Sequence, residues 1–446
     1  MSARELESLH LADLHALASE HGIPEYRMLR RRQLIEALQE ADTDELEIVG
    51  ADVEADAADA GADDEDEVVV EGTVLTDETP EPVELGAGGP EEGDEKRDTT
   101  PTDTVRGTLE LTRQRYGFLR LTALTPDPGD VYISAAQVRR CELRPGDEVS
   151  GPAREPRRGE RHRALVHVDT VNGEEPQVEG GRPDFDALAP VPPERRFALD
   201  VDRENVLVRA VDLLAPLAFG QRALVRAAPR SGRTTLLRGV ARAAAAAEAR
   251  VIVLLVDERP EEATAWRESL PVAEFAIATA DYAPAEQVRI AELALERAKR
   301  LAESGADAVL VCDSLSRLAF AAGGVDEVKR VFGAGRNLAG GGSLTVVATI
   351  LDGAHDEGDA ERSVLTTESA LVTLDPALAG AGVHPALVAS GCCVSNEDSL
   401  REPDELEAVR ELRAELAELE PRAAAELLRS RIEASATNAE LLSSPG

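Results

Sequence analysis

The chain has 446 residues, of which 43% are hydrophobic, so it is long enough for two or three domains and a large core. Its net charge of −38 excludes a protein that coats nucleic acid along its whole surface, because phosphates would be repelled. With no signal peptide and no apolar run of membrane-spanning length, we expect a cytoplasmic protein with no membrane partner.

The first 103 residues divide into two segments of different composition. Residues 1–42 are predicted to form an N-terminal helical domain, because leucines recur at helical spacing from Leu6 to Leu17 and again from Leu34. The basic cluster at 27–32 is either a solvated helix face or a contact for nucleic acid. Residues 43–103 hold 23 acidic and two basic residues and too little apolar surface for a core, which predicts a disordered acidic linker.

Residues 104–172 are predicted to form a small barrel of the OB or cold-shock type. The expected strands alternate in polarity, are separated by Gly and Pro, and lie at 108–111, 116–121, 131–133 and 164–168. Tyr116 and Phe118 share one face of a strand, where single-stranded bases can stack. This segment has 12 basic and nine acidic residues, which reverses the sign of the overall charge. We therefore favour an RNA-binding face over an aromatic pair that only fills the core.

A connector at 173–198 precedes the predicted α/β domain at 199–435, and residues 436–446 are treated as a tail. Continuous apolar runs, typical of parallel strands buried on both faces, lie at 251–256, 308–312 and 344–350. A helix is predicted at 284–304, and an amphipathic C-terminal helix begins at Glu402. The expected fold class is an α/β domain with a mostly parallel sheet, preceded by the barrel and the helical domain.

The strongest motif is the loop at 227–235, which reads Ala-Ala-Pro-Arg-Ser-Gly-Arg-Thr-Thr. An apolar run at 223–225 precedes it and an Ala-rich helical segment follows, as in the strand, loop and helix of a P-loop (RecA-like) NTPase. The usual pattern, G-x-x-x-x-G-K-[ST], has Ala227 here at its first glycine and Arg233 at its lysine. Backbone N–H groups of this loop would cradle phosphates, and the Thr234 hydroxyl would coordinate Mg2+.

Two further apolar strands end in carboxylates. Glu258 follows the run at 251–256 and is placed to orient an attacking water as a general base. Asp313 follows the run at 308–312, in the Walker B position that holds Mg2+. One acidic residue at a strand end is weak evidence, but two of them after a P-loop sequence predict a site for ATP and Mg2+.

The order of these segments resembles the bacterial transcription termination factor Rho family from residue 1 to about 430, apart from the acidic insertion. The segments that carry the resemblance are 115–120, 130–134, 137–140, 159–161, 220–222, 257–262, 313–319 and 333–337. The resemblance implies a hexameric RNA-dependent ATPase that translocates on RNA and unwinds RNA–DNA hybrids. The implied partners are single-stranded RNA and the RNA polymerase elongation complex, with assembly as a homo-hexamer or together with a true Rho.

The resemblance also implies roles for individual residues. Those that would contact pyrimidine-rich RNA are Tyr116, Phe118, Arg120, Asp130, Tyr132, Glu160 and His162, the last in place of the family's tyrosine. Those that would bind the nucleotide are Ala227, Pro229, Arg230, Ser231, Gly232, Arg233, Thr234, Thr235, Arg259 and His384. Glu258 would be the catalytic carboxylate, and Thr234 and Asp313 would be the Mg2+ ligands.

The departures from the family's pattern gather where ATP turnover and translocation are carried out. Arg230 and Arg233 replace its two loop lysines, and a guanidinium is a planar fork rather than a compact ammonium. His384 replaces its adenine-stacking aromatic residue, and Ser395 falls at the position of its arginine finger. The loop at 352–362 carries an acidic residue near the family's RNA-gripping lysine, where it would repel phosphate.

Three hypotheses follow. In the first, the chain is a termination factor that uses ATP for RNA-dependent translocation, as the domain order, Glu258 and Asp313 favour. In the second, it is a hydrolysis-impaired paralogue that binds RNA or nucleotide as a regulator or ring subunit, as Arg233 and Ser395 favour. In the third, it is a structural oligomer that retains only the fold. We expect weak or absent ATP turnover.

Overall fold

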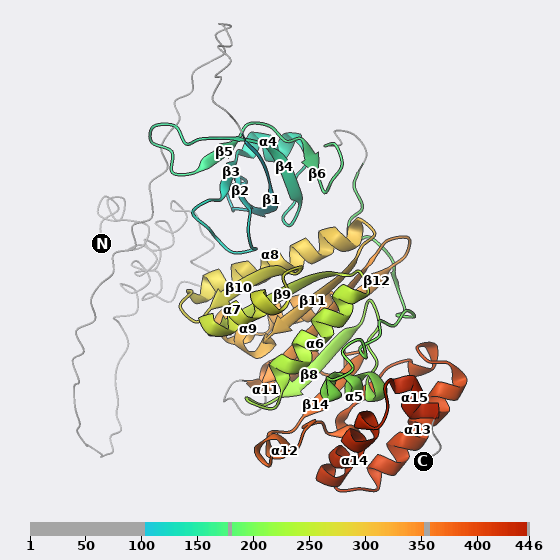
Figure 1. Cartoon of the computed structure of the whole chain (residues 1–446). Coiled ribbons are helices and arrows are strands. Elements are labelled where there is room, and N and C mark those ends of the chain that lie inside the picture. The colour runs from blue at the N-terminus through green and yellow to red at the C-terminus, as the bar shows by residue number, and fades with distance from the viewer. Residues whose placement is uncertain (1–102, 177–180, 352–356, 444–446) are drawn as a thin grey trace, which may run out of the picture. The chain divides into compact units, whose positions relative to one another are not determined.

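The computed structural model describes residues 103–176, 181–351 and 357–443. The predicted helical domain at 1–42, its basic cluster and the linker up to residue 102 lie outside the described residues. Within the described part, a small barrel is followed along the chain by a larger α/β domain (Figure 1).

The barrel consists of β1 (Asp103–Leu111), β2 (Gly117–Arg120), β3 (Val131–Ile133), α4 (Ala135–Arg140), β4 (Glu148–Arg154), β5 (Arg163–Leu165) and β6 (Thr170–Val171). The strand order is β1-β2-β3-β5-β4-β6, and β1 also pairs with β4, which closes five strands into a barrel. The small OB-type barrel predicted from the sequence is thereby confirmed. The sequence pattern does not reveal β4, which contains Gly151 and Pro152 and therefore reads as a turn.

The pleat of β2 and β3 separates an apolar interior from an aromatic outer face. Leu119 and Ile133 are fully buried in the barrel core. Because successive side chains of a strand point to opposite faces, Phe118 and Tyr132 point the other way. These two residues lie directly opposite each other in the antiparallel register of β2 and β3. The register therefore builds the aromatic face from separate strands.

The large sheet contains β8 (Arg222–Ala227), β9 (Arg250–Glu258), β10 (Glu274–Thr279), β11 (Asp307–Asp313), β13 (Ser343–Leu351), β14 (Ala370–Leu374) and β15 (Cys393–Val394). Their order is β10-β9-β11-β13-β8-β14-β15, with parallel pairing from β10 to β14 and antiparallel pairing of β15. The short strands β7 (Pro190–Val191) and β12 (Arg336–Leu338) pair with each other, and β12 pairs with β13. The predicted mostly parallel α/β sheet is confirmed.

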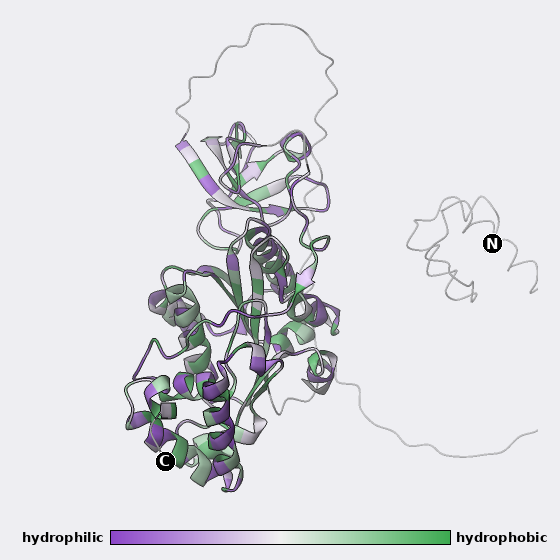
Figure 2. Ribbon diagram, turned by 90° about the vertical axis from the view of Figure 1, so that its right-hand side faces the viewer, coloured by the Kyte–Doolittle hydropathy of each residue, from purple (hydrophilic) through white to green (hydrophobic). Residues whose placement is uncertain are grey.

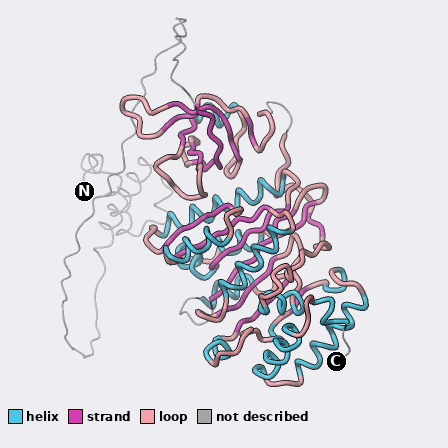
Figure 3. The backbone as a smooth tube through the Cα atoms, viewed as in Figure 1, coloured by secondary structure: helices cyan, strands magenta, loops and turns pink. Residues whose placement is uncertain are grey.

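Helices cover both faces of this sheet (Figures 1 and 3). One core contains side chains of α5 (Val206–Leu214), α6 (Arg233–Ala246) and α7 (Pro260–Ser269). The other contains side chains of α8 (Pro284–Glu303), α9 (Leu315–Ala322), α10 (Asp326–Gly333) and α11 (Glu357–Val364). Neighbouring strand residues alternate between the cores, as Val253 and Leu254 do, so the central strands are hydrophobic along their length (Figure 2).

The C-terminal region contains α12 (Pro376–Gly380), α13 (Pro403–Ala417), α14 (Pro421–Glu433), α15 (Asn438–Ser443) and short 3-10 turns at Ala389–Gly391 and Glu397–Ser399. The sequence pattern predicts one amphipathic helix here, whereas three helices follow Glu402, because Pro421 begins a new helix at a position where proline is favoured. Asn438 in α15 accepts a hydrogen bond from Arg209 Nε (3.2 Å) and donates one to Asp212 Oδ2 (2.9 Å). Part of the expected tail is thus built into the fold.

The barrel and the α/β domain are joined by direct backbone contacts. The β2–β3 loop of the barrel inserts Leu124 into the core of the α/β domain, and its N–H donates to the Phe275 carbonyl oxygen (2.7 Å). Gly146 has a φ of 82°, and a Cβ at this position would lie 2.4 Å from the Glu296 carbonyl carbon. Only glycine permits this approach, so the barrel backbone packs directly on α8.

Candidate functional site

The loop at 227–235 connects the end of β8 to the start of α6. Arg230 and Gly232 both have left-handed backbone conformations, with φ of 67° and 98°, which turn the chain sharply into the helix. Gly232 is the residue before the helix, and no side chain caps the first turn. The free N–H groups of Arg233, Thr234 and Thr235 therefore form the anion-binding end of a helix dipole. Thr234 is half-buried and Thr235 is exposed.

Two acidic side chains lie at the same edge of the sheet as this loop. Glu258 ends β9 and Asp313 ends β11; only 4% and 1% of these residues are exposed. Arg233 lies between them: its Nη2 donates to Glu258 Oε1 (2.9 Å) and its Nε pairs with Asp313 Oδ2 (3.1 Å). One guanidinium thus spans the residue predicted to activate water and the residue predicted to hold Mg2+.

Further groups engage the same two carboxylates. Arg317 of α9 pairs with Glu258 Oε1 (2.6 Å), and the backbone N–H of Arg259 donates to Glu258 Oε2 (3.1 Å). Thr349 of β13 donates its hydroxyl hydrogen to Asp313 Oδ1 (2.8 Å). Burial raises the pKa of Asp313, and the charge of Arg233 and the Thr349 hydrogen bond act in the opposite direction.

Sequence reasoning assigned no role to Arg317 or Thr349. A usable signal was available for Arg317, which follows Asp313 by four residues and so begins the next helix close to the strand end. Thr349 offers no such signal, because its contact depends on the parallel pairing of β11 with β13.

The residues present fit Mg2+ only after a rearrangement. Asp313 and the Thr234 hydroxyl supply hard oxygen donors of the kind that Mg2+ prefers. Both oxygens of Asp313 are already engaged, however, one by Arg233 and one by Thr349. Across the described residues, no cluster of three or more His, Cys, Asp or Glu side chains could hold a metal ion. The fit therefore requires that Arg233 release Asp313.

Of the remaining residues assigned to the nucleotide site, Ala227 and Ser231 are buried, and Pro229 is exposed. Arg230, Arg259 and His384 are exposed, as is Ser395 at the predicted finger position. Within the described ranges, no hydrogen bond or ion pair joins the side chain of His384 or Ser395 to the loop at 227–235. Their roles at the nucleotide remain predictions.

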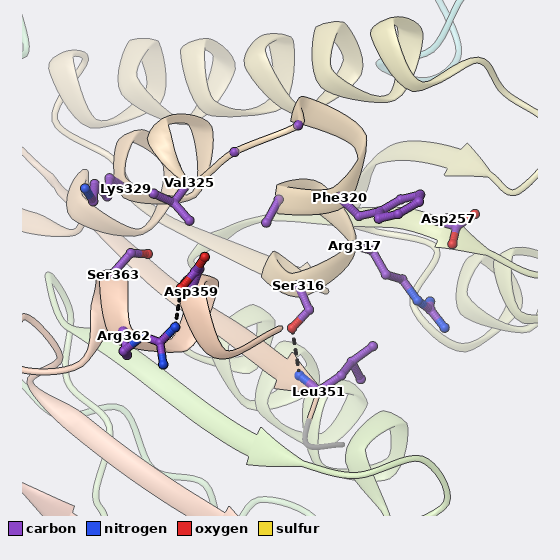
Figure 4. Close-up of a pocket in the computed structure, with 13 residues that line it drawn as sticks. Asp257, Ser316, Arg317, Phe320, Val325, Lys329, Leu351, Asp359, Arg362 and Ser363 are labelled. Carbon is purple, nitrogen blue, oxygen red and sulfur yellow. Dashed lines mark hydrogen bonds and ion pairs between the residues drawn. The ribbon is translucent and has the colours of Figure 1, made fainter. Parts of the chain in front are cut away.

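A cavity of about 1030 Å³ is lined in part by Arg317, the residue that pairs with Glu258 (Figure 4). Basic side chains of Arg317, Lys329 and Arg362 line it together with Asp257 and Asp359. Arg362 pairs with Asp359, as the dashed line in Figure 4 shows. Residues 352–356 of the predicted acidic pore loop lie outside the described residues, so the structure does not test the repulsion expected there.

Aromatic rings gather on the outer face of the barrel. Ring centroids are separated by 5.9 Å for Tyr116 and Phe118, 5.6 Å for Tyr116 and Tyr132, and 6.1 Å for Phe118 and Tyr132. His162 packs edge-to-face on Phe118 at 5.0 Å. Burial, together with Tyr116 and Glu160 nearby, raises the pKa of Tyr132. The four rings form one partly exposed surface of the kind on which bases stack.

A cavity of about 370 Å³ opens beside Phe118 and His162. Arg120, which lines it, is buried and pairs with Asp130 and with Glu110, whose Oε2 accepts from Arg120 Nε (2.7 Å). Asp130 is 1% exposed, and its Oδ1 has no hydrogen-bond partner within the described structure.

Glu160 is held on the surface by arginines. Its carboxylate accepts from Arg154 at 2.7 and 2.8 Å and from the backbone N–H of Arg157 at 2.8 Å. These hydrogen bonds lower the pKa of Glu160 to about 2. The structure thus places all seven residues assigned to RNA on the barrel, and rings and carboxylates are fixed by neighbouring side chains.

None of the described helices combines the length and the apolar character needed to cross a membrane.

Three family models match successive parts of the chain. The N-terminal domain model of Rho termination factor matches residues 5–45, and its RNA-binding domain model matches residues 105–177. The model of the ATP synthase alpha/beta family nucleotide-binding domain matches residues 208–331. The matched RNA-binding segment contains the aromatic face, and the matched nucleotide-binding segment contains the loop, Glu258 and Asp313.

Curated relatives named transcription termination factor Rho align with more than half of this chain. The Streptomyces lividans protein is 38% identical over 365 residues, which cover 76% of this chain and 51% of that protein. The Bacillus subtilis protein is 42% identical over 267 residues, which cover 55% of this chain and 62% of that protein. This chain therefore spans about half of the Streptomyces protein. The Chromobacterium violaceum protein is 38% identical over 361 residues, which cover 74% of this chain and 85% of that protein. The chain belongs to the Rho family of transcription termination factors.

Proposed function

We propose that this chain is a Rho-type transcription termination factor. Its barrel binds nascent single-stranded RNA, and its P-loop domain binds ATP with Mg2+ and uses hydrolysis to translocate on RNA and unwind RNA–DNA hybrids. The supporting observation is that one chain carries a four-ring stacking face and a phosphate loop beside two buried carboxylates. The proposed partners are RNA, the elongating RNA polymerase, and further copies of the chain or a true Rho in a ring.

The residues of the nucleotide site would divide the work as follows. The N–H groups at the start of α6 would bind the phosphates, and Glu258 would orient the attacking water. Mg2+, when held by Thr234 and Asp313, would neutralise charge on the phosphoryl group. Arg233 would have to turn from the carboxylates to the phosphates before either role is available, because it now pairs with both carboxylates.

The bridging position of Arg233 favours a second candidate function, that of a hydrolysis-impaired paralogue. Arg233 and Arg317 both pair with Glu258, and Arg233 also pairs with Asp313. A guanidinium long enough to span both acids competes with the nucleotide-bound cation for the same oxygens. Such a chain would bind RNA and nucleotide and act as a regulator or a ring subunit.

The experiment that separates the candidates is ATP hydrolysis by the full chain with and without poly(C). Strong stimulation by RNA would establish the first candidate and contradict the second. Binding of RNA and ATP without turnover would establish the second. Failure to bind RNA in a filter assay would refute both.

A further inference from the structure

One basic residue that lines the cavity beside Phe118 does not belong to the barrel. Arg289 lies on α8 of the α/β domain, yet it lines this cavity together with Phe118, Arg120 and His162. Its side chain is 50% exposed, whereas that of Arg120 is 7% exposed. Arg289 is therefore the more accessible of the two guanidiniums around the cavity.

Glu110 connects the two arginines. Its Oε2 accepts from Arg120, and its Oε1 pairs with Arg289 Nε at 2.8 Å. The Glu110 side chain is only 11% exposed, so its charge is shared by two cations from two domains. Each guanidinium has one further acidic partner, Asp130 for Arg120 and Glu286 for Arg289. The two arginines differ in exposure, and only Arg289 is open to a ligand from solvent. Glu286 lies 3.5 Å from Arg289 on the same helix, and Asp127 also lines the cavity.

The position of α8 against the barrel is fixed by contacts in the part of the helix that follows Arg289. Arg297, two turns further along the helix, is 3% exposed and pairs with Glu148 of the barrel (3.0 Å). At the end of the helix, Glu303 pairs with Arg144 of the barrel (2.8 Å). These buried or half-buried pairs hold α8 against the barrel, and Arg289 of the same helix lines the cavity.

We propose that Arg289 binds a phosphate of the RNA strand whose base occupies the cavity beside Phe118. This inference rests on the proposed RNA binding by the barrel, and it assigns the α/β domain a direct contact with that RNA. A single strand carries one phosphate per nucleotide, so a base stacked on Phe118 brings a phosphate near the rim of the cavity. An exposed arginine already held in place by one carboxylate is preorganised for this contact and can exchange Glu110 for the phosphate.

The test is a salt titration of RNA binding with the full chain and a labelled oligo(C) probe. Neutralising one phosphate contact with single-stranded nucleic acid adds about 0.7 to the slope of log K against log salt. We expect Arg289→Gln to lower this slope by about 0.7 and Arg289→Lys, which keeps the charge, to retain it. The matched control is Arg429→Gln: Arg429 is 49% exposed and pairs with a glutamate of its own helix, but lies on α14.

Each outcome decides one question. A slope in Arg289→Gln equal to that of the unaltered chain refutes the phosphate contact, whatever the affinity. A slope that falls equally in Arg429→Gln also refutes it, because the effect is then one of overall charge. If the unaltered chain does not bind oligo(C), the proposed RNA binding itself fails. Phe118→Ala provides a further distinction, since loss of stacking should weaken binding without lowering the slope, and circular dichroism confirms that each variant is folded.

Discussion

The barrel and the nucleotide site respond differently to a changed residue. In the barrel, His162 stands where the family has tyrosine, yet its ring packs 5.0 Å from Phe118 and extends the same aromatic face. In the nucleotide site, Arg233 keeps the positive charge of the family's lysine but reaches both Glu258 and Asp313. The histidine leaves the aromatic face of the barrel assembled. The arginine instead occupies the two carboxylates of the nucleotide site.

The difference follows from what each chemistry requires. Stacking needs a flat surface of roughly the right size, and imidazole and phenol rings both supply one. Phosphoryl transfer needs a cation at the phosphates and carboxylates free to act on water and metal. The arginine at 233 keeps the cation, but it pairs with the two carboxylates that the reaction needs free. Conservation of charge is therefore a poor guide to conservation of turnover at such a site.

The largest expected effect comes from restoring both altered parts of the hydrolysis site. We expect the double variant Arg233→Lys, Ser395→Arg to raise RNA-stimulated phosphate release by at least about 100-fold, because an arginine finger alone is worth about 10³–10⁵ in rate. Lysine at 233 is too short to hold both carboxylates, which frees Asp313. The matched control is Arg238→Lys with Ser399→Arg, two nearby changes that touch neither carboxylate. Equal turnover in the two double variants would show that our account of the site is mistaken.

A smaller effect is expected at the barrel. Phe118→Ala should weaken oligo(C) binding by about 1–3 kcal/mol, the range measured for loss of one base–aromatic contact. Phe118→Tyr keeps the ring and should bind nearly as well as the unaltered chain. Fluorescence anisotropy measures both. Unchanged affinity of the alanine variant would remove the aromatic face from the RNA site and with it the contrast between the two regions.

The smallest effect concerns pH. The pKa of Glu160 is lowered to about 2, chiefly by its hydrogen bond with Arg154, so its stabilising contribution is present above its ordinary pKa near 4.5. That contribution is lost as the pH falls toward 2. The unaltered chain should therefore melt at a slightly higher temperature than Glu160→Gln at pH 6, and the difference should vanish near pH 2. Glu155→Gln serves as a control at an exposed neighbour. A difference that disappears already near pH 4.5 would mean that Arg154 does not hold Glu160.

The fold was predictable where one property of the sequence decides it. The runs that became β9 and β11 are apolar without interruption, and only Thr345 and Thr349 interrupt that of β13, as expected of strands buried on both faces. The segments that became β10 and β14 are short, and β14 is buried only at alternate residues, so they do not stand out from helix or loop. One C-terminal helix was predicted because the leucines recur at helical spacing. The chain instead starts a second helix at Pro421, a local signal that the leucine pattern does not show.

The site was predictable only in part. Strand ends place Glu258 and Asp313 at the loop, because parallel strands direct their carboxyl ends to one edge. The direction of the Arg233 side chain is not encoded in any local pattern, since it is decided by where two acids meet in space. The Arg289–Glu110 pair could not be predicted from the sequence either. It joins a helix of one domain to a strand of another, and no spacing in the sequence relates the two residues.

The leucine that the barrel inserts into the neighbouring domain couples the stability of the two domains. Leu124 is 3% exposed, and burying a leucine side chain contributes about 1.5–3 kcal/mol. A cut between the barrel and the P-loop domain would leave this side chain in water on one fragment and an unfilled depression beside Phe275 on the other. Each fragment would be less stable, and more prone to aggregate, than the same domain in the intact chain. The two domains are expected to unfold together, in a single cooperative transition, although the chain folds each around a separate core.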